Sequence, residues 1–383
     1  MAPQAMSNLT LDELRNDPFG PEKVLMVTDP RTGMRGYLVI DNTARGVGKG
    51  GVRMQPDLTL KEILRLARTM TWKNAAADLP LGGAKGGIVA DPHDPNREAL
   101  IRSYARSLRS LIPDEYVFGL DMGLTENDAA LVVDELGKPA VATGKPACLG
   151  GIPYDELMIT GYGVVESIEV ACQLVGIELK GARVVVQGFG AVGRGVAHFC
   201  HKKGALVVAV SDSKKVLWDP EGLDVGHLLQ VKRATGSLQG ARCGRPIPHG
   251  EELLLEAEVL VPAARGDVIT RENVHGVKAK VVAEGANCAV TVEAQRELHK
   301  RGVYLIPDFI ANAGGVIAAY IEMVNGTPSQ AFKYTRDKVR KNTLEMFQIC
   351  QRTGLIPREA AMKMARERVI QAMVAKGSWK ERR

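Results

Sequence analysis

Residues 60–70 carry apolar and charged side chains with the period of a helix. The apolar positions lie three or four residues apart: Leu60, Ile63, Leu64, Ala67 and Met70. This spacing predicts an amphipathic helix, and Thr59 with Glu62 has the spacing of the capping box that begins one. Lys73 follows Met70 by three positions and so extends the apolar face. A lysine on such a face needs a carboxylate, a ligand or a shifted pKa.

The first 145 residues otherwise alternate short strands, turns and helices. Two apolar runs flank the turn sequence DPRTG and predict a hairpin, and the glycine-rich segment LGGAKGG leads into a strand after Pro80. The expected strands are 24–28, 36–41, 52–54 and 116–120, and the further helices are 95–111 and 125–137.

From Tyr162 onward the pattern becomes that of strands alternating with helices. The expected strands are 183–187, 206–211, 258–261, 280–283 and 303–306, with helices at 162–175 and 191–203. The last three strands lead into the loops PAARGD, EGANCA and DFIANAGG. In an open parallel sheet such loops lie at the carboxyl ends of strands, where ligands bind.

The expected fold class is α/β, with two domains around a cleft. Residues 1–145 and 325–383 are assigned to an α/β substrate-binding and oligomerisation domain, and residues 146–324 to a Rossmann dinucleotide-binding domain. The run GKPACLGGIPYDE is interpreted as the hinge. Helices at 320–324, 334–352 and 357–375 are expected to pack back against the first domain and span the cleft.

Composition excludes several classes of protein. A length of 383 residues favours two domains, and a net charge of +6 with only 5% aromatic residues disfavours nucleic-acid binding. The basic tail KGSWKERR is interpreted as a solvated helix end. Six scattered cysteines and seven unclustered histidines indicate neither disulfides nor a metal site. Without a signal-peptide pattern or an apolar run of ~20 residues, the chain is expected to be soluble and cytoplasmic, with no membrane partner.

The hexapeptide GFGAVG follows a predicted strand and begins a helix. Gly188 permits the tight turn, Gly190 lets the backbone approach a diphosphate, and Gly193 allows close packing of helix on strand. The whole predicted cofactor loop is Gly188, Phe189, Gly190, Ala191, Val192 and Gly193.

Asp212 lies roughly 20 residues beyond the loop, where an acid binds the adenosine ribose of NAD. NAD is therefore the predicted cofactor. Ser211, Ser213, Lys214 and Lys215 surround this acid and offer a site for a 2′-phosphate, which leaves NADP or dual use open.

Three lysines and one aspartate are candidates for substrate chemistry. Lys73 ends the amphipathic helix, Lys85 lies within GGAKGG, Lys49 precedes two glycines, and Asp121 ends an apolar run. Lowering a lysine pKa from ~10.4 to ~8, as a base near neutral pH requires, costs about 3 kcal/mol and is within reach of burial beside other cations. The glycines flanking Lys85 are expected to leave room for a substrate.

These residues also have simpler interpretations. Lys73 is alternatively a cation at a helix C-terminus, and Asp121 alternatively begins a turn. GGAKGG is alternatively a phosphate loop, although it lacks the GxxxxGK[ST] pattern.

The ordered motifs resemble those of the glutamate/leucine/phenylalanine/valine dehydrogenase family. They run over nearly the whole chain: GKGGVRM, TWKNAAADLPLGGAKGG, FGLDMG, ITGYGV, GFGAVG, AEGAN and IPDFIANAGGV. The resemblance implies a two-domain homo-oligomer, usually a hexamer. The implied reaction is the reversible oxidative deamination of an L-2-amino acid to a 2-oxo acid and ammonia, with hydride transfer to nicotinamide.

By matching motif, the resemblance also implies roles for individual residues. Lys73 resembles the lysine that binds the substrate α-carboxylate, Lys85 the catalytic lysine, and Asp121 the carboxylate that moves protons to and from the amine. Thr160 and Asn312 resemble residues near the nicotinamide, and Asn287 resembles one near the cofactor ribose. Ser213, beside Asp212, and Ala263, in the loop PAARGD, complete the predicted cofactor contacts.

The substrate side chain depends on two positions. In glutamate-specific members of the family, a lysine matching Lys49 binds the side-chain carboxylate, with help from a serine where this chain has Ala319. Losing that hydroxyl removes a hydrogen bond worth about 1–2 kcal/mol. The retained lysine favours glutamate. The alternatives are a branched-chain or other aliphatic amino-acid dehydrogenase, and a non-catalytic regulatory subunit of a hetero-oligomer. GGIPYDELMITG and EGANCAV depart from the family's usual forms near the nicotinamide.

Overall fold

The computed structural model describes residues 17–379 and divides the chain into two compact units. The first unit comprises Met1–Pro153, Ala319–Pro328 and Met364–Arg383, and the second comprises Tyr154–Ala318 and Ser329–Lys363. The N-terminal segment up to residue 16 and residues 380–383 of the basic tail, both interpreted above, lie outside the described residues.

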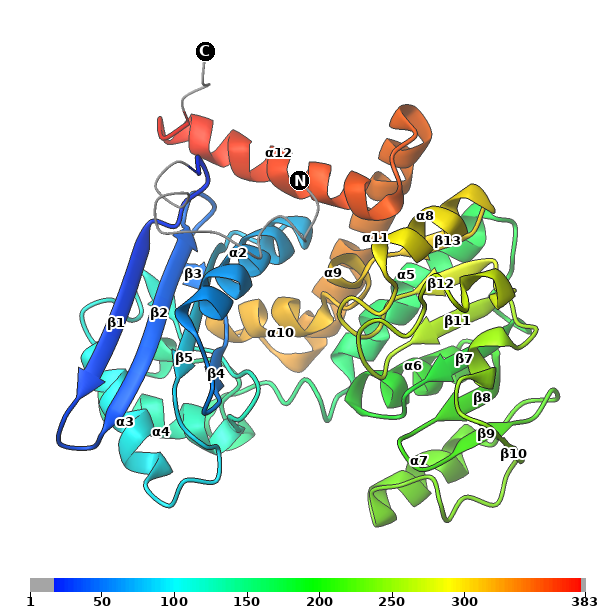
Figure 1. Cartoon of the computed structure of the whole chain (residues 1–383), viewed down its shortest axis with the longest axis horizontal. Coiled ribbons are helices and arrows are strands. Elements are labelled where there is room, and N and C mark those ends of the chain that lie inside the picture. The colour runs from blue at the N-terminus through cyan, green and yellow to red at the C-terminus, as the bar shows by residue number, and fades with distance from the viewer. Residues whose placement is uncertain (1–16, 380–383) are drawn as a thin grey trace. The chain divides into compact units, whose positions relative to one another are not determined.

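The first unit is built on a six-stranded sheet (Figure 1). Strands β1 (Lys23–Asp29) and β2 (Met34–Asn42) form the predicted antiparallel hairpin, and the order continues β1-β2-β5-β3-β6, with β4 paired to β5. The remaining strands are β3 (Gly48–Lys49), β4 (Val52–Met54), β5 (Gly82–Ile88) and β6 (Tyr116–Val117). β5 is central, because β2, β3 and β4 all pair with it.

Helices cover both faces of this sheet because side chains alternate along its strands. Val39 packs with Ile63 and Ala67 of α2 (Leu60–Ala76), whereas Leu38 and Ile40 belong to the larger core shared with α3 (Arg97–Ser107) and α4 (Glu126–Leu136). Thr59 caps α2 as predicted, accepting a hydrogen bond from the Glu62 amide at 3.2 Å. The Glu62 side chain, however, binds Arg53.

The glycines of β5 serve packing, which corrects the expectation that they leave room for a substrate. All seven residues of β5 are buried. A Cβ on Gly83 would lie 2.1 Å from Thr71 Oγ1 of α2, and one on Gly86 would lie 2.4 Å from the Tyr104 hydroxyl. These glycines therefore allow α2 and Tyr104 to approach the strand that carries Lys85.

The second unit is a doubly wound sheet in the order β10-β9-β8-β7-β11-β12-β13. β7, β8, β11, β12 and β13 are mutually parallel, as expected of a Rossmann domain, and β9 and β10 add antiparallel strands at one edge. The strands are β7 (Arg183–Gln187), β8 (Leu206–Ser211), β9 (Val216–Trp218), β10 (Arg245–Ile247), β11 (Val259–Pro262), β12 (Val281–Ala283) and β13 (Tyr304–Ile306). The helices up to β13 are α5 (Ile159–Leu174), α6 (Ala191–Lys202), α7 (Val225–Thr235) and α8 (Val292–Lys300). The predicted α/β class with two domains is confirmed.

The C-terminal helices are divided between the two units, and the division differs from the expected boundary at residue 325. They are α9 (Asp308–Ala311), α10 (Gly314–Met323), α11 (Pro328–Thr353) and α12 (Pro357–Ala375). Residues 329–363 belong to the second unit, where Arg340 of α11 pairs with Glu166 of α5 at 3.0 Å. The end of α12 belongs to the first unit, where Arg368 Nη1 donates to the Ala75 carbonyl at 3.0 Å. Each segment thus makes an arginine contact within the unit to which it belongs.

No helix in the described range 17–379 is both long and apolar enough to cross a membrane.

The close approach of α2 to β5 predicts a large cost for adding one methyl group. Gly83→Ala places a Cβ 2.2 Å from the Thr71 backbone nitrogen, so α2 must move, and we expect the free energy of unfolding to fall by about 3 kcal/mol. Urea unfolding followed by circular dichroism measures this. Gly240→Ala, whose Cβ would have its nearest neighbour at 3.7 Å, is the control and should change stability by less than about 0.5 kcal/mol. Equal stability of the two variants would contradict the packing role.

Candidate active site

Lys85 and Asp121 form a largely buried ion pair in the first unit. Lys85 is in the centre of β5 and is 5% exposed, and its Nζ lies 2.8 Å from Asp121 Oδ2. Asp121 follows Leu120, which forms an isolated bridge with Val52 of β4. The two residues that the sequence analysis proposed as catalytic are therefore in direct contact.

The surroundings move both pKa values downward. Burial lowers the pKa of Lys85, and the positive charge of Arg53 adds to this effect, while Asp121 and Glu62 oppose it. Burial raises the pKa of Asp121, but Lys85 and Arg53 outweigh it and lower the pKa of that carboxyl overall. The pair thus combines an ionised carboxylate with a lysine that releases its proton more readily than an exposed one.

Arg53 is the residue near this pair that the sequence analysis missed. Its Nε donates to Asp121 Oδ2 at 2.9 Å, and its positive charge helps to lower the pKa of Lys85. The signal was present in the motif GKGGVRM, where an arginine stands between the apolar residues Val52 and Met54 of a short strand. A charge at such a position points away from the core that its neighbours fill.

Lys49 is a second buried lysine in the first unit. It is 4% exposed on β3, and its Nζ donates to the Phe118 carbonyl at 2.9 Å. Burial lowers its pKa to about 7, the negative charge of Glu322 raises it, and Lys145 and Lys85 lower it further. Lys49 is therefore held by carbonyl oxygens without forming a salt bridge to any carboxylate among residues 17–379.

The negative charge of Glu322 is already balanced by other groups. Its carboxylate is buried and accepts hydrogen bonds from Lys145 Nζ at 2.6 Å and from the Gly144 and Ile152 amides, each at 3.1 Å. Ala319 precedes Glu322 by three positions on α10, so the two residues share a helix face.

Lys73 lies in the last turn of α2 and is half-buried. The next residue, Asn74, donates from Nδ2 to the Lys49 carbonyl at 3.2 Å and to the Gly82 carbonyl at 2.7 Å. These bonds join the end of α2 to β3 and β5, the strands that carry Lys49 and Lys85. The last turn of α2, with Lys73 in it, is thus fixed to the two strands that carry the other lysines.

The loop GFGAVG lies between β7 and α6 in the second unit, with Gly190 as the N-cap of α6. Gly188 has φ +92°, a Cβ on Gly193 would lie 1.8 Å from the Gly188 carbonyl oxygen, and a Cβ on Gly190 would meet nothing within 4 Å. The first and third glycines therefore serve the turn and its packing, and the second leaves open space at a helix N-terminus. This geometry fits a dinucleotide diphosphate.

The other predicted cofactor contacts lie at the same end of the sheet, where the parallel strands have their carboxyl ends. Asn312 donates from Nδ2 to Asn287 Oδ1 at 2.9 Å. A Cβ on Gly285 would lie 2.8 Å from that of Ala263, and one on Gly315 would lie 3.2 Å from Thr160 Oγ1. Loops that follow β11, β12 and β13 thus meet at the carboxyl ends of the parallel strands.

Asp212 is arranged differently from the expectation that it binds a ribose. Its Oδ2 accepts from Lys232 Nζ at 2.9 Å and from the Leu238 amide at 2.7 Å. Its Oδ1 accepts from the amides of Lys214 and Lys215 at 2.9 and 3.0 Å. The side chain is only 5% exposed, so both oxygens are already bound within the protein. Ser213 and Lys214 are the exposed residues beside it.

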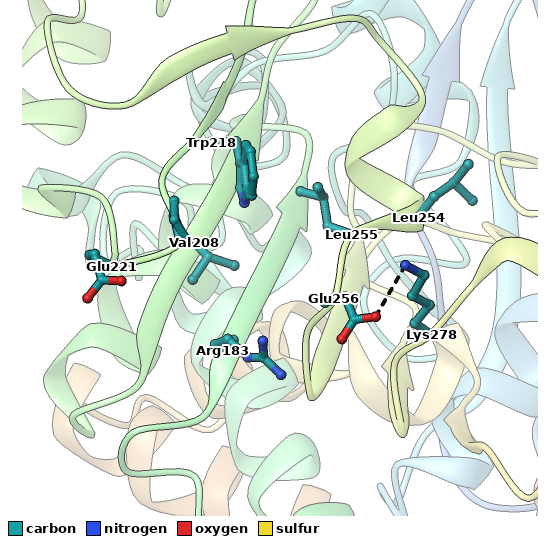
Figure 2. A pocket seen from close by; sticks show the side chains of 9 residues that line it. Arg183, Val208, Trp218, Glu221, Leu254, Leu255, Glu256 and Lys278 are labelled. Carbon is teal, nitrogen blue, oxygen red and sulfur yellow. Dashed lines mark hydrogen bonds and ion pairs between the residues drawn. The ribbon is translucent and has the colours of Figure 1, made fainter.

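A cavity of about 540 Å³ lies at the other end of the second unit's sheet (Figure 2). It is lined by Arg183, the first residue of β7, and by Glu256 and Lys278, which precede β11 and β12. Figure 2 shows Lys278 and Glu256 paired there, at 3.3 Å. None of the predicted site residues lines this cavity, and ligands of open parallel sheets bind at the opposite, carboxyl ends.

No group of three or more His, Cys, Asp or Glu side chains is arranged for a metal ion in the part of the chain that the structure describes.

Two family models together match most of the chain. Residues 21–138 match the model described as Glu/Leu/Phe/Val dehydrogenase, dimerisation domain, and residues 150–377 match the model described as Glutamate/Leucine/Phenylalanine/Valine dehydrogenase.

Curated relatives and solved structures agree with these matches. A glutamate dehydrogenase from Aeropyrum pernix is 40% identical over 357 residues, covering 88% of this chain and 85% of the relative. A cryptic catabolic NAD-specific glutamate dehydrogenase from Bacillus subtilis is 38% identical over 81% of this chain and 75% of its own. The structure of a hetero-hexameric glutamate dehydrogenase from Thermus thermophilus, in a leucine-bound form, superposes with a TM-score of 0.83 at 34% identity, covering 99% of this chain and 95% of the other.

Proposed function

The chain belongs to the glutamate/leucine/phenylalanine/valine dehydrogenase family, and we propose that the L-amino acid it deaminates is glutamate. An amino-acid dehydrogenase converts an L-amino acid, water and oxidised nicotinamide cofactor into a 2-oxo acid, ammonium, reduced cofactor and a proton. The bound cofactor supplies the hydride acceptor.

The contact between Lys85 and Asp121 supports a division of the proton transfers between these two residues. Neutral Lys85 takes the proton of the water that adds to the C=N carbon of the imino acid left by loss of hydride from Cα, and its protonated form then stabilises the carbinolamine that results. Asp121 accepts a proton from the substrate amine and returns one to the leaving ammonia. Lys73 holds the α-carboxylate. The lowered pKa of Lys85 favours its use as a base, and the lowered pKa of Asp121 keeps it ionised as a proton acceptor.

The glutamate side chain is assigned from Lys49. A buried ammonium held only by carbonyl oxygens is poorly compensated, and Glu322 has its own cation in Lys145. A substrate carboxylate would supply the missing negative charge. This uncompensated buried lysine is the observation that carries the choice of glutamate.

Two alternatives remain distinct from this proposal. Ala319 offers no hydroxyl, and a neutral Lys49 would tolerate an aliphatic side chain, as a branched-chain enzyme requires. A regulatory, non-catalytic subunit is disfavoured by the intact pair of Lys85 and Asp121.

A panel of L-amino acids, followed by formation of reduced cofactor, tests the substrate assignment. We expect glutamate to give the highest kcat/KM, and Lys49→Leu to lower that value by about 100-fold or more while kcat/KM for leucine holds or rises, because removing one partner of a buried ion pair costs about 3–5 kcal/mol. Lys61→Leu, an exposed lysine on α2, is the control. Leucine far above glutamate in the wild-type protein would refute the glutamate assignment, and no turnover of any amino acid would favour the regulatory subunit.

The pH dependence of substrate preference follows from the pKa of Lys49, which is about 7. Below that pH Lys49 is charged and ready for a carboxylate. Above it the neutral form prevails, so glutamate must bind with uptake of a proton, at a cost of about 1.4 kcal/mol for each further pH unit. The ratio of kcat/KM for glutamate to that for leucine should therefore fall as the pH rises above about 7. A ratio independent of pH would argue against a carboxylate at Lys49.

We infer that the protein uses NADP as well as NAD. Asp212 is neutralised by Lys232 and turned inward, so it neither binds the ribose nor repels a 2′-phosphate as an exposed acid would. The exposed hydroxyl of Ser213 and ammonium of Lys214 at the carboxyl end of β8 suit a phosphate.

Charge reversal at Lys214 tests this cofactor assignment by binding alone. Lys214→Glu should raise the Kd for NADP about tenfold, which is about 1.4 kcal/mol, and change the Kd for NAD by less than about twofold. Titration calorimetry measures both constants. Lys180→Glu is the control, because Lys180 is exposed and precedes the amino end of β7, whereas Lys214 follows the carboxyl end of β8. Equal changes in the Kd for NADP and for NAD would show that Lys214 does not discriminate between the two cofactors.

The assembly and location of the protein are proposals of the same kind. The first unit matches a dimerisation-domain model, and the Thermus thermophilus relative is described as a hexamer of two kinds of chain. We propose a homo-oligomer, most simply a hexamer, in the cytoplasm.

A further inference from the structure

Arg53 binds two carboxylates at once from the short strand β4. Its neighbours Val52 and Met54 are buried in the core, which directs the Arg53 side chain to the opposite face. There its Nε donates to Asp121 Oδ2 at 2.9 Å and its Nη1 donates to Glu62 Oε1 at 2.6 Å. The planar guanidinium therefore links the proposed proton acceptor to α2.

The two cations beside Asp121 hold the same oxygen. Lys85 Nζ lies 2.8 Å from Oδ2, and Arg53 Nε lies 2.9 Å from it. Within residues 17–379, no donor binds Oδ1. This arrangement fixes the carboxylate plane and leaves the second oxygen for the substrate amine.

Glu62 fixes the far end of Arg53. It is the third residue of α2, whose N-cap Thr59 binds the Glu62 amide at 3.2 Å. A glutamate in a capping box returns its side chain to the helix N-terminus, whereas this one extends to Arg53. Its backbone is thus held by the cap while its carboxylate holds the arginine.

We propose that Arg53 and Glu62 are positioning residues for the deamination, with Arg53 orienting Asp121 toward the substrate amine and Glu62 holding Arg53 in place. This role rests on the proposed function. Neither residue is required to contact the substrate, since both act through Asp121 and Lys85.

The charges of the two residues affect Lys85 in opposite directions. Beyond the effect of burial, Arg53 lowers the pKa of Lys85 and Glu62 raises it. Because Lys85 acts when neutral, kcat/KM rises with pH through its pKa. Removing the charge of Arg53 should move that rise to higher pH, and removing the charge of Glu62 should move it to lower pH.

The pH profiles of kcat/KM for Arg53→Gln, Glu62→Gln and Arg53→Lys test the proposal. We expect Arg53→Gln to lower kcat by about 10- to 100-fold with a change in amino-acid KM of less than about threefold, because misplacing a reacting group costs about that much. Arg53→Lys should restore the position of the pH rise, since it keeps the charge, but not kcat, since an ammonium cannot bridge both carboxylates. Arg102→Gln is the matched control, because Arg102 bridges Glu98 and Asp134 at 2.9 and 2.7 Å on α3 and α4.

A second readout needs no substrate. Acetic anhydride labelling of Lys85, quantified by mass spectrometry across pH, reports the same pKa, and the two glutamine variants should shift its midpoint in opposite directions. If the wild-type protein turns over no amino acid but the two variants still shift the labelling midpoint, the proposed function is refuted. The influence of Arg53 and Glu62 on Lys85 would then still stand. An active wild type whose kcat, pH profile and labelling midpoint are all unmoved in both variants would overturn the positioning role. Glu62→Gln keeps the test decisive if Arg53→Gln fails to fold.

Discussion

The contact between Lys85 and Asp121 is the interaction on which the proposed chemistry of the first unit depends. Taking a lysine out of water disfavours its charge, and an adjacent carboxylate restores part of that charge. The balance leaves the pKa of Lys85 below that of an exposed lysine, which favours its use as a base. Arg53 contacts the same carboxylate, so two cations share the Oδ2 atom of Asp121.

Close packing makes this burial possible. The glycines of β5 admit α2 at one face and Tyr104 at the other, an approach that side chains at those positions would block. Asn74 then ties the end of α2 to β3 and β5. The glycine-rich segment that was alternatively interpreted as a phosphate loop is the central strand of a sheet. The packing of α2 and Tyr104 against this strand holds Lys85 in place.

Much of the fold could be predicted from the sequence because its periodicity is local. Strands such as Arg183–Gln187 and Leu206–Ser211, and the cap at Thr59, depend on residues close together in the chain. The contact between Lys85 and Asp121 was accessible only through the family's motifs. The inward turn of Asp212 could not be predicted in this way, because it depends on Lys232, which lies on another element. Arg53 stands in a motif that marks it, but its contact with Asp121 joins residues far apart in the chain and has no local signal. The unit to which α11 belongs was missed for the same reason.

Replacement of Lys85 by alanine tests the central claim most directly. If Lys85 is the base of an amino-acid dehydrogenase, Lys85→Ala should lower kcat for the best amino-acid substrate by about 1,000-fold or more, since general acid–base catalysis contributes about 10²–10⁴. The Kd for reduced cofactor, followed by nicotinamide fluorescence, should stay within about twofold, because the cofactor loop belongs to the second unit. Activity within tenfold of the wild-type value, with the cofactor still bound, would contradict the account.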